Sequence, residues 1–335
     1  MRAWMLRRSG SPDVLRLEDV AVPDPGPGRV RVRVQRIGIN YAEILSREGL
    51  YSWAPKRPYV PGMEATGTID AVGPGVERAL GGRVLCGMQT GAYAEYVVVP
   101  QARALPALPH LTDAENAAFA VNFMTAWVAL VEMARLRAPD RVAVSAAAGG
   151  VGTAAVQIAA AHGCHVTGLA GSDEKLERVL SLGAAAGVNY RRDGWADAWE
   201  PEGGGLDVVL ELVGADVFTA CRQRLAPFGR LVVAGYAALD YSLWNPLSWW
   251  RAWRGAPRMD IVKASQDSIG VMATHIGYLL PDEERLLRVW GALTTFAGEH
   301  GLRPVVGATY PFERLPEAHA FMESRKSVGK ILVEL

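Results

Sequence analysis

Residues 144–159 read VSAAAGGVGTAAVQIA and match the pattern G-x-G-x-x-A at Gly150, Gly152 and Ala155. In a turn between a strand and a helix, Gly150 permits the tight turn, Gly152 lets a pyrophosphate approach the backbone, and Ala155 lets the helix lie close to the strand. The free N–H groups and the positive dipole end of the helix N-terminus then favour the anion. The stretch predicts a dinucleotide-binding turn; the alternative is a glycine-rich turn that binds nothing.

The end of the following strand indicates which dinucleotide would bind. An NAD site usually carries an acid there, hydrogen-bonded to the ribose 2′-OH. Here Gly171 and Ser172 occupy that point, and Asp173 begins the next helix, which Ser172 is expected to cap. Lys175 follows one turn later. A hydroxyl and an ammonium without an acid on the strand tip favour a 2′-phosphate, so we expect NADPH. The alternative for Lys175 is an ordinary solvated lysine.

A doubly wound parallel sheet would position these residues. Thr112 and Glu115 form a capping-box signature for a helix start, and a second helical stretch covers residues 121–136. Strands and helices then alternate, which predicts a parallel sheet. The expected strands are 141–145, 165–170, 206–212 and 229–234, and the expected helices are 151–162, 173–182 and 215–225.

The first hundred residues alternate with period two instead. In GRVRVRVQRIGIN the valines at 30, 32 and 34 share one face and the arginines at 29, 31 and 33 the other, which is typical of a half-buried strand. Short strands at this spacing predict a compact, barrel-like β unit. After residue 280 we expect a helix, a strand at 303–310, a helix at 314–324 and a strand at 330–335, which return to this unit.

Composition narrows the function classes. The 335 residues hold 35 Lys plus Arg and 35 Asp plus Glu, and this neutral balance argues against a nucleic-acid binder. The three cysteines are Cys86, Cys164 and Cys221; their number and spacing fit neither a disulfide framework nor a four-cysteine zinc lobe, and they suit a reducing compartment. The N-terminus lacks an apolar core of signal-peptide length. We expect a soluble, cytoplasmic protein.

The sequence resembles the medium-chain dehydrogenase/reductase superfamily, specifically its zinc-free quinone oxidoreductase branch. That branch includes zeta-crystallin and the homologues of a synaptic vesicle membrane protein. The resemblance covers nearly the whole chain and rests on GINYAEILSREGLY, PGMEATG, AAAGGVG, GSDEK, NY at 189–190 and ESRKSVGKILV. It implies an α/β fold, with a GroES-like β-barrel catalytic domain in residues 1–122, to which 266–335 return, and a Rossmann NADPH-binding domain in residues 123–265.

The chain departs from the zinc-dependent members of this superfamily. Those proteins carry a cysteine ligand near the position of Asn40 and a histidine where Met63 stands. A thioether is a poor Zn²⁺ ligand, so we expect no metal site and a structural role for Glu64. None of the six histidines forms a ligand-spaced pair, and His110 and His319 are expected at the surface.

The resemblance also implies a set of NADPH ligands. Two residues have open alternatives: Tyr190 could be a packed aromatic at a strand end, and Arg325 a surface arginine beside Lys326. The 2′-phosphate would be surrounded by Ser172, Lys175, Tyr190 and Arg325, and the middle of the cofactor would be held by Thr125 and the backbone of Gly149, Gly150, Val151 and Gly152.

The implied reaction is hydride transfer from NADPH to an electron-poor small molecule, a quinone or an α,β-unsaturated carbonyl. Tyr51 matches the family's active-site tyrosine and would donate a hydrogen bond to the acceptor oxygen, and Asn40 could offer an amide donor to the same region. Tyr41 stands where related multidomain enoyl reductases carry a tyrosine tied to proton delivery. Leu45 replaces a further pocket tyrosine of the family. The alternative for both tyrosines is a packed aromatic at a domain edge.

A tryptophan-rich segment is the main sequence feature that concerns partners. Residues 242–255, SLWNPLSWWRAWRG, hold four tryptophans. They fit peripheral contact with a membrane; the alternatives are a flap over the substrate cleft or a dimer contact. A homodimer is expected through an edge strand at 268–276. Two other functions stay open: a standalone enoyl-thioester reductase, and an NADPH-binding, membrane-associated protein with little turnover.

Overall fold

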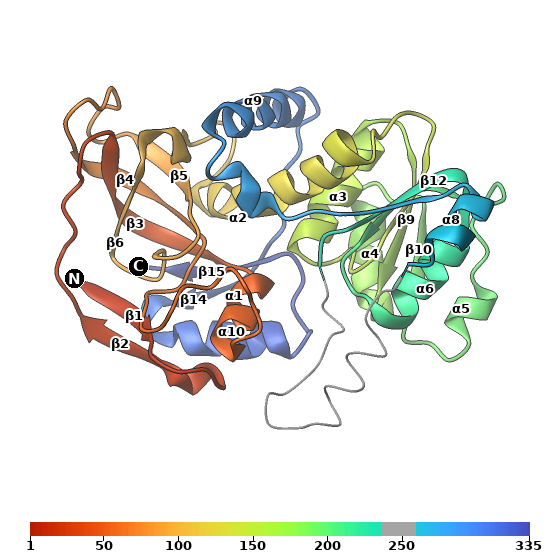
Figure 1. The fold of residues 1–335 in the computed structure, drawn as a ribbon, viewed down its shortest axis with the longest axis horizontal. Coiled ribbons are helices and arrows are strands. Elements are labelled where there is room, and N and C mark those ends of the chain that lie inside the picture. Colours follow the sequence, from red (N-terminus) through yellow and green to blue (C-terminus); the bar gives the residue numbers. More distant parts are fainter. Residues whose placement is uncertain (236–258) are drawn as a thin grey trace. The chain divides into compact units, whose positions relative to one another are not determined.

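The computed structural model describes residues 1–235 and 259–335 (Figure 1). The tryptophan-rich segment 242–255 lies outside the described residues. The chain forms two compact units. We call the unit made of Met1–Val121, Gly277–Glu299 and Arg303–Leu335 the N-terminal unit, and the unit made of Asn122–Ile276 and His300–Leu302 the central unit.

Among its described residues, the central unit contains a six-stranded sheet with the order β10-β9-β8-β11-β12-β13, in which every neighbouring pair is parallel. After β8, the chain places β9 and β10 in turn on one side of β8, and then β11, β12 and β13 on its other side. The point where this order reverses is where such sheets bind ligands, at the carboxyl ends of the strands. The predicted doubly wound sheet is confirmed. Its strands are β8 (Arg141–Val144), β9 (His165–Ala170), β10 (Ala186–Asn189), β11 (Leu206–Glu211), β12 (Leu225–Val233) and β13 (Gly270–Ala273).

One predicted boundary is wrong. Residues 266–276 were assigned to the returning C-terminal segment, but they belong to the central unit because β13 continues its sheet beside β12, with Leu231 opposite Val271. The chain returns to the N-terminal unit at Gly277. The strand expected at 268–276 is β13, Gly270–Ala273, and it is an edge strand of the central sheet.

The main helices of the central unit follow the predicted ranges within two residues: α3 (Gly150–Ala161), α4 (Asp173–Ser181) and α6 (Ala215–Gln223). Two short helices, α5 (Trp195–Ala198) and α8 (Ile261–Asp267), and the strand β10 were not predicted. The two helices expected around residue 121 form one run, α2 (Asp113–Trp127) and the π-helical turn η3 (Val128–Met133). By length and composition alone this run could cross a membrane. However, 67% of its most apolar 18-residue stretch is buried inside the protein, as in the core helix of a globular domain.

The N-terminal unit has a seven-stranded sheet with the order β14-β15-β3-β4-β5-β7, and β6 pairs with β3. The C-terminal strand β15 lies antiparallel to β3, with Ile331 opposite Ile39 (Figure 1). The valines at 30, 32 and 34 of β3 are buried, as their alternation predicts. The strands of this sheet are β3 (Arg29–Ile39), β4 (Glu64–Val72), β5 (Arg83–Gly87), β6 (Tyr96–Pro100), β7 (Ala104–Pro106), β14 (Val306–Pro311) and β15 (Lys330–Glu334). Two further strands, β1 (Arg2–Leu6) and β2 (Leu15–Asp19), form a separate antiparallel pair.

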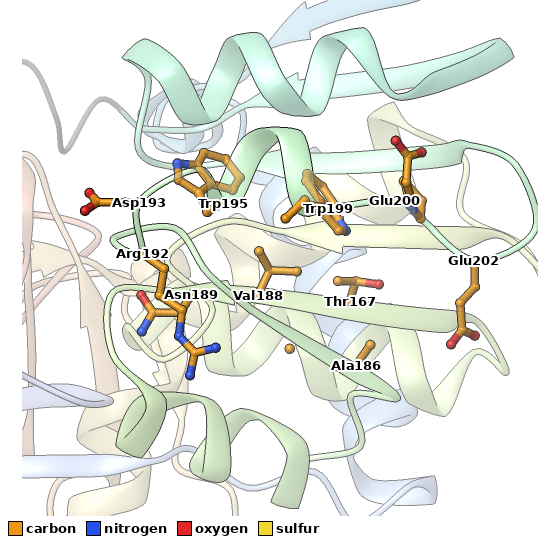
Figure 2. Close-up of a pocket in the computed structure, with 13 residues that line it drawn as sticks. Thr167, Ala186, Val188, Asn189, Arg192, Asp193, Trp195, Trp199, Glu200 and Glu202 are labelled. Carbon is orange, nitrogen blue, oxygen red and sulfur yellow. The ribbon is translucent and has the colours of Figure 1, made fainter.

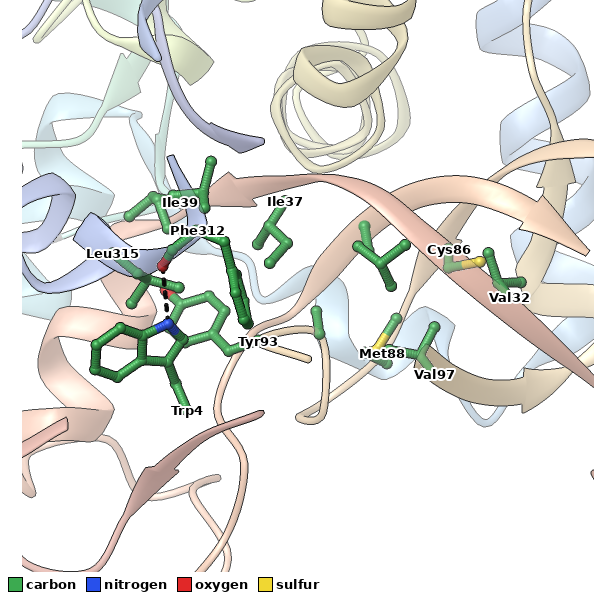
Figure 3. Packing of buried hydrophobic residues seen from close by; sticks show 14 of the residues in the cluster. Trp4, Val32, Ile37, Ile39, Cys86, Met88, Tyr93, Val97, Phe312 and Leu315 are labelled. Atoms are coloured by element: carbon green, nitrogen blue, oxygen red, sulfur yellow. Dashed lines mark hydrogen bonds between the residues drawn. The ribbon is translucent and has the colours of Figure 1, made fainter. Parts of the chain in front are cut away.

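Residues from the two ends of the chain meet in the core of this unit (Figure 3). The Trp4 indole Nε1 donates a hydrogen bond to the Phe312 carbonyl at 3.0 Å, and the two rings meet edge to face. A buried indole N–H needs such a partner. The same cluster includes Ile39, Tyr93 and Leu315. Of the helices, α10 (Leu315–Glu323) contributes Leu315 and Ala318 to the cluster. The other helices of this unit are α1 (Tyr41–Glu48) and α9 (Glu283–Glu299), and the short turns are η1 (Pro12–Val14), η2 (Gln101–Arg103), η5 (Phe312–Arg314) and η4 (Ile276–Leu279), which begins at the last residue of the central unit before Gly277.

Candidate functional site

The predicted dinucleotide turn connects β8 to α3 at the point where the strand order reverses. Gly149 is the N-cap of α3 and offers no side chain to the helix end. The N–H groups of Gly150, Val151 and Gly152 open the helix and have no acceptor within it. Gly149, Gly150 and Val151 are partly exposed. Backbone donors and the positive end of the helix dipole therefore face an accessible position, which is the arrangement that binds a phosphate.

The structure shows close packing at two of these glycines. A Cβ on Gly152 would lie 2.2 Å from the carbonyl oxygen of Ala146 and 2.6 Å from the Ala147 Cα, so this glycine lets α3 approach its own turn. A Cβ on Gly150 would lie 2.6 Å from the Asn122 Nδ2 atom. Gly152 is buried, and the accessible positions of the turn are Gly149, Gly150 and Val151. That Gly152 lets a pyrophosphate approach the backbone stays a prediction. Ala155 is buried, as expected.

This geometry makes a stability prediction. Alanine is normally better than glycine in a helix by about 0.5–1 kcal/mol. Gly152→Ala should nevertheless destabilise the protein by about 1–3 kcal/mol, because the methyl group overlaps the Ala146 carbonyl. Chemical denaturation followed by circular dichroism measures the change. The control is Gly291→Ala in α9, where a Cβ meets nothing within 4 Å and should stabilise. A stabilising Gly152→Ala would contradict the close helix–turn contact.

Three residues predicted to hold the 2′-phosphate lie just after the carboxyl ends of β9 and β10. Ser172 is the N-cap of α4, as predicted, and its hydroxyl accepts a hydrogen bond from the Lys175 N–H at 3.4 Å. The Tyr190 hydroxyl lies 3.5 Å from the point that a Cβ on Gly171 would occupy, and the Arg191 Nε lies 3.2 Å from it. Burial and the nearby charge of Arg191 lower the pKa of Lys175. The sequence did not single out Arg191, because an arginine after a strand is common and Arg192 stands next to it.

Two acids begin α4 beside this place, and both are engaged. The Glu174 carboxylate accepts a hydrogen bond from the Ser172 side chain, which is the largest cause of the lowered pKa of Glu174. Asp173 accepts hydrogen bonds from Arg192 Nη2 at 2.7 Å and from Asn189 Nδ2 at 2.9 Å. These bonds, with Arg192 the larger cause, lower the pKa of the exposed Asp173 carboxyl. The Asp173 carboxylate is thus engaged by the end of β10, while Glu174 is the acid at the Ser172 hydroxyl. That the strand tip suits a phosphate better than a ribose hydroxyl stays a prediction.

The two remaining predicted cofactor residues lie in different units. Thr125 is buried on α2 in the central unit, one turn after Asn122, whose side chain contacts Gly150. Arg325 follows α10 in the N-terminal unit, is exposed, and has a left-handed backbone conformation with φ of 57°. Its predicted contact with the 2′-phosphate stays a prediction.

A pocket of about 370 Å³ lies against β9 and β10, beside α5 (Figure 2). Trp195 and Trp199 stack with their ring centroids 6.2 Å apart. Asn189 and Arg192 line one end of the pocket, while Glu200 and Glu202 line the other. None of the predicted cofactor residues lines this pocket. It is therefore separate from the glycine turn.

In the N-terminal unit, Asn40 is the N-cap of α1 and is buried. Its Nδ2 donates to the Gly38 carbonyl at 3.2 Å and to Glu64 Oε1 at 3.1 Å, and its Oδ1 accepts from Lys330 Nζ at 2.6 Å. Both hydrogens of the amide therefore have protein acceptors. The prediction that Asn40 offers its amide to a substrate oxygen is not supported by these contacts, because the amide is used inside the protein.

Glu64 has the structural role that the sequence predicted. Its Oε1 forms an ion pair with Lys330 Nζ, and its Oε2 accepts from the Val121 N–H at 3.1 Å. Both side chains are buried, at 3% and 2% exposure, so each charge requires the other. In residues 1–235 and 259–335, no three His, Cys, Asp or Glu side chains gather in a way that could hold a metal ion.

Tyr51 and Tyr41 lie at opposite ends of α1. Tyr51 is partly buried just after the helix, and burial, followed by the negative charge of Glu43, raises the pKa of its hydroxyl to about 12. Tyr41 is the first residue of α1 and is partly exposed. Two residues beyond Tyr51, the Trp53 ring meets Tyr278 edge to face at 4.6 Å, and 65% of Tyr278 is exposed. No local pattern predicts this pair, because 225 positions separate its members.

A buried polar chain continues from α1 into α10. The Tyr93 hydroxyl donates to Glu43 Oε2 at 2.6 Å and lies 2.8 Å from His319 Nε2. The prediction that His319 lies at the surface is wrong, because α10 packs this face on the core and leaves the imidazole 0% exposed. Burial, and then the charge of Arg47, lowers the pKa of His319 to about 3.

His319 should therefore stay neutral in the folded protein at mild acidity. The unfolded chain takes up this proton below the ordinary pKa of 6.5. Its contribution to the free energy of unfolding is thus complete above pH 6.5 and falls by about 1.4 kcal/mol per pH unit toward pH 3. In histidine-labelled NMR spectra, we expect one of the six imidazoles not to titrate between pH 7.5 and 5.

The matched variant is His319→Gln, which keeps a donor for Tyr93. It should remove the silent imidazole signal and flatten the loss of stability below pH 6.5. Titration of all six imidazoles near pH 6.5 in the wild type would contradict the buried neutral state.

Known proteins are similar to this chain over its whole length. Residues 26–110 match the family described as alcohol dehydrogenase GroES-like domain, and residues 150–256 the family described as zinc-binding dehydrogenase. The quinone oxidoreductase of Rattus norvegicus is 32% identical over 343 residues, covering 100% of this chain and 98% of the relative. The synaptic vesicle membrane protein VAT-1 homolog of the same species is 32% identical over 341 residues, covering 99% and 84%.

Among solved structures, the quinone oxidoreductase of Thermus thermophilus, also solved in complex with NADPH, has 36% sequence identity and a TM-score of 0.81 over 100% of both chains. This chain belongs to the medium-chain dehydrogenase/reductase superfamily. Its relatives place it in the quinone oxidoreductase branch, so the predicted family and fold are confirmed. In this medium-chain dehydrogenase/reductase, the central unit carries the glycine turn together with Lys175 and Arg191, and the N-terminal unit carries Tyr41 and Tyr51.

Proposed function

We propose that this protein transfers hydride from NADPH to a quinone or an α,β-unsaturated carbonyl without using a metal ion. The observation that carries the proposal is the place where β9 and β10 end. There Ser172 and Lys175 begin the helix that follows β9. Tyr190 follows β10 beside Gly171, and Asp173 is held by Arg192. A partly buried lysine beside an arginine suits a phosphate dianion on the ribose, which would take the Ser172 hydroxyl from Glu174. The NADPH complex of the T. thermophilus relative supports the same cofactor.

The described residues fit the rest of such a cofactor. The N–H groups at the start of α3, from Gly150 to Gly152, would hold the pyrophosphate, with Gly149 leaving the helix end open. Thr125 and Arg325 keep their predicted roles at the middle of the cofactor and at the 2′-phosphate. NADPH, when bound, supplies the hydride, and the protein supplies position and a proton donor.

The donor atoms at the zinc-ligand positions argue for metal independence. Met63 brings a thioether and Asn40 an amide whose hydrogens are already donated. Glu64, which might otherwise coordinate a cation, is neutralised by the Lys330 ammonium. These groups do not form the thiolate and imidazole set that Zn²⁺ prefers. An acceptor that needs no Lewis acid, with a carbonyl conjugated to a reactive π-bond, is the substrate class consistent with this chemistry.

Tyr51 is the proposed hydrogen-bond donor to the acceptor oxygen. With a pKa of about 12, its hydroxyl keeps its proton across the working range of pH. We further propose a cytoplasmic homodimer that pairs through β13, the margin of the central sheet. Membrane contact through 242–255 concerns residues outside the described ranges and is left to experiment.

The central test is NADPH oxidation by the purified chain with benzoquinone, a short enal and an enoyl thioester, with and without a chelator. We expect turnover with the quinone or the enal, unchanged by the chelator, and no stoichiometric zinc by elemental analysis. A preference for the thioester would make the protein an enoyl-thioester reductase. Tight NADPH binding without turnover on any acceptor would make it a binding protein, and loss of activity with the chelator would refute metal independence.

Tyr51→Phe tests the proton donor. The substitution keeps the aromatic ring and removes the hydroxyl that would donate to the acceptor oxygen. We therefore expect kcat to fall by roughly a hundredfold and the NADPH affinity to stay the same. Because the pKa is about 12, the wild-type rate should show no loss from Tyr51 ionisation up to about pH 10. Tyr41→Phe is the matched control on the other end of α1. An unchanged kcat in Tyr51→Phe, or a loss confined to Tyr41→Phe, would move the donor role away from Tyr51.

A further inference from the structure

We propose that Arg191 binds the 2′-phosphate of the cofactor and sets the preference for NADPH over NADH, and that the adjacent Arg192 does not. This inference rests on the proposed function and assigns a specificity-determining residue at the same site. It goes beyond the cofactor ligands that the sequence predicted, which were Ser172, Lys175, Tyr190 and Arg325.

The geometry places the Arg191 side chain at the strand tip. Gly171 follows the last residue of β9, and the point that its Cβ would occupy lies 3.2 Å from Arg191 Nε and 3.5 Å from the Tyr190 hydroxyl. Two donors from the end of β10 therefore converge over the backbone of the residue that follows β9. This is where a ribose bound at a doubly wound sheet presents its 2′ substituent.

Arg191 carries an exposed charge at this place. Within residues 1–235 and 259–335, no carboxylate lies at ion-pair distance from its guanidinium. Its charge acts on the neighbouring Lys175 and, together with burial, lowers the pKa of that ammonium. Two like charges near each other repel, and a phosphate dianion between them would turn this repulsion into two attractions.

Arg192 faces a different partner although it is the next residue. Its guanidinium pairs with Asp173 Oδ2 at 2.7 Å, beside Asn189 (Figure 2). Asn189 helps to separate the two arginines, because its Oδ1 accepts the Arg191 N–H at 3.0 Å while its Nδ2 donates to Asp173. The two arginines thus form a natural matched pair: Arg192 neutralises the nearby acid, and Arg191 keeps its charge for a ligand.

The experiment measures the dissociation constants of NADPH, NADH and 2′,5′-ADP for the full-length wild type, Arg191→Gln and Arg192→Gln by titration calorimetry. Arg191→Gln should weaken NADPH and 2′,5′-ADP by roughly tenfold to a hundredfold and leave NADH within about twofold, because only the first two carry the 2′-phosphate. Arg192→Gln should weaken NADPH by less than about threefold. Arg191→Lys should recover part of the affinity, since it restores the charge.

Unchanged NADH binding serves as the folding control for every variant. Arg191→Gln with wild-type affinity for 2′,5′-ADP would overturn the inference and leave the proposed function intact. Equal losses in Arg191→Gln and Arg192→Gln would also overturn it, because the two residues would then act alike. A wild type that binds NADH as tightly as NADPH would instead overturn the proposed cofactor, and this inference with it.

Discussion

The first turn of α3 lies so close to the turn before it that no side chain fits at position 152. The carbonyl of Ala146 and the Cα of Ala147 fill the place of a Cβ. This contact fixes where the helix begins relative to the end of β8, and so fixes the direction of its free N–H groups. A phosphate site built from backbone works only when that backbone is held in place. On the β9 side of β8, the same sheet brings Lys175 and Tyr190 to the neighbouring strand ends.

Both units satisfy the carboxylates that they bury. In the N-terminal unit, Lys330 pairs with Glu64, and Glu43 accepts from the Tyr93 hydroxyl and from the Met63 N–H at 2.7 Å. Buried charges are tolerated only when paired and hydrogen-bonded. In the central unit, the buried Glu211 accepts from the Ser145 hydroxyl at 2.9 Å. The exposed Arg191 after β10 differs from these groups, because no described carboxylate pairs with it.

Local patterns predicted the central sheet well, because period, caps and turns are properties of neighbouring residues. The Ser172 cap and the ranges of α3, α4 and β9 follow from a few positions each. The strand β10 was missed, since its four residues, AGVN, show no alternation and contain a glycine. The prediction also failed where the partner is distant in the chain. Asn40 was taken for a substrate ligand, but its amide is tied to Lys330, 290 positions later. The expectation that His319 lies at the surface failed for the same reason: its imidazole is buried beside Tyr93, which is 226 positions earlier in the chain.

The ion pair between Lys330 and Glu64 has a consequence for the order in which the two units can fold during synthesis. The ammonium that neutralises Glu64 comes from the last strand, and Phe312, which accepts the Trp4 indole N–H, comes shortly before it. During synthesis from the N-terminus, the central unit has all its described strands once Ala273 has left the ribosome. The unit that begins the chain must wait for the final residues. Until then Glu64 has no ammonium partner, and β3 shows an open edge where β15 will pair.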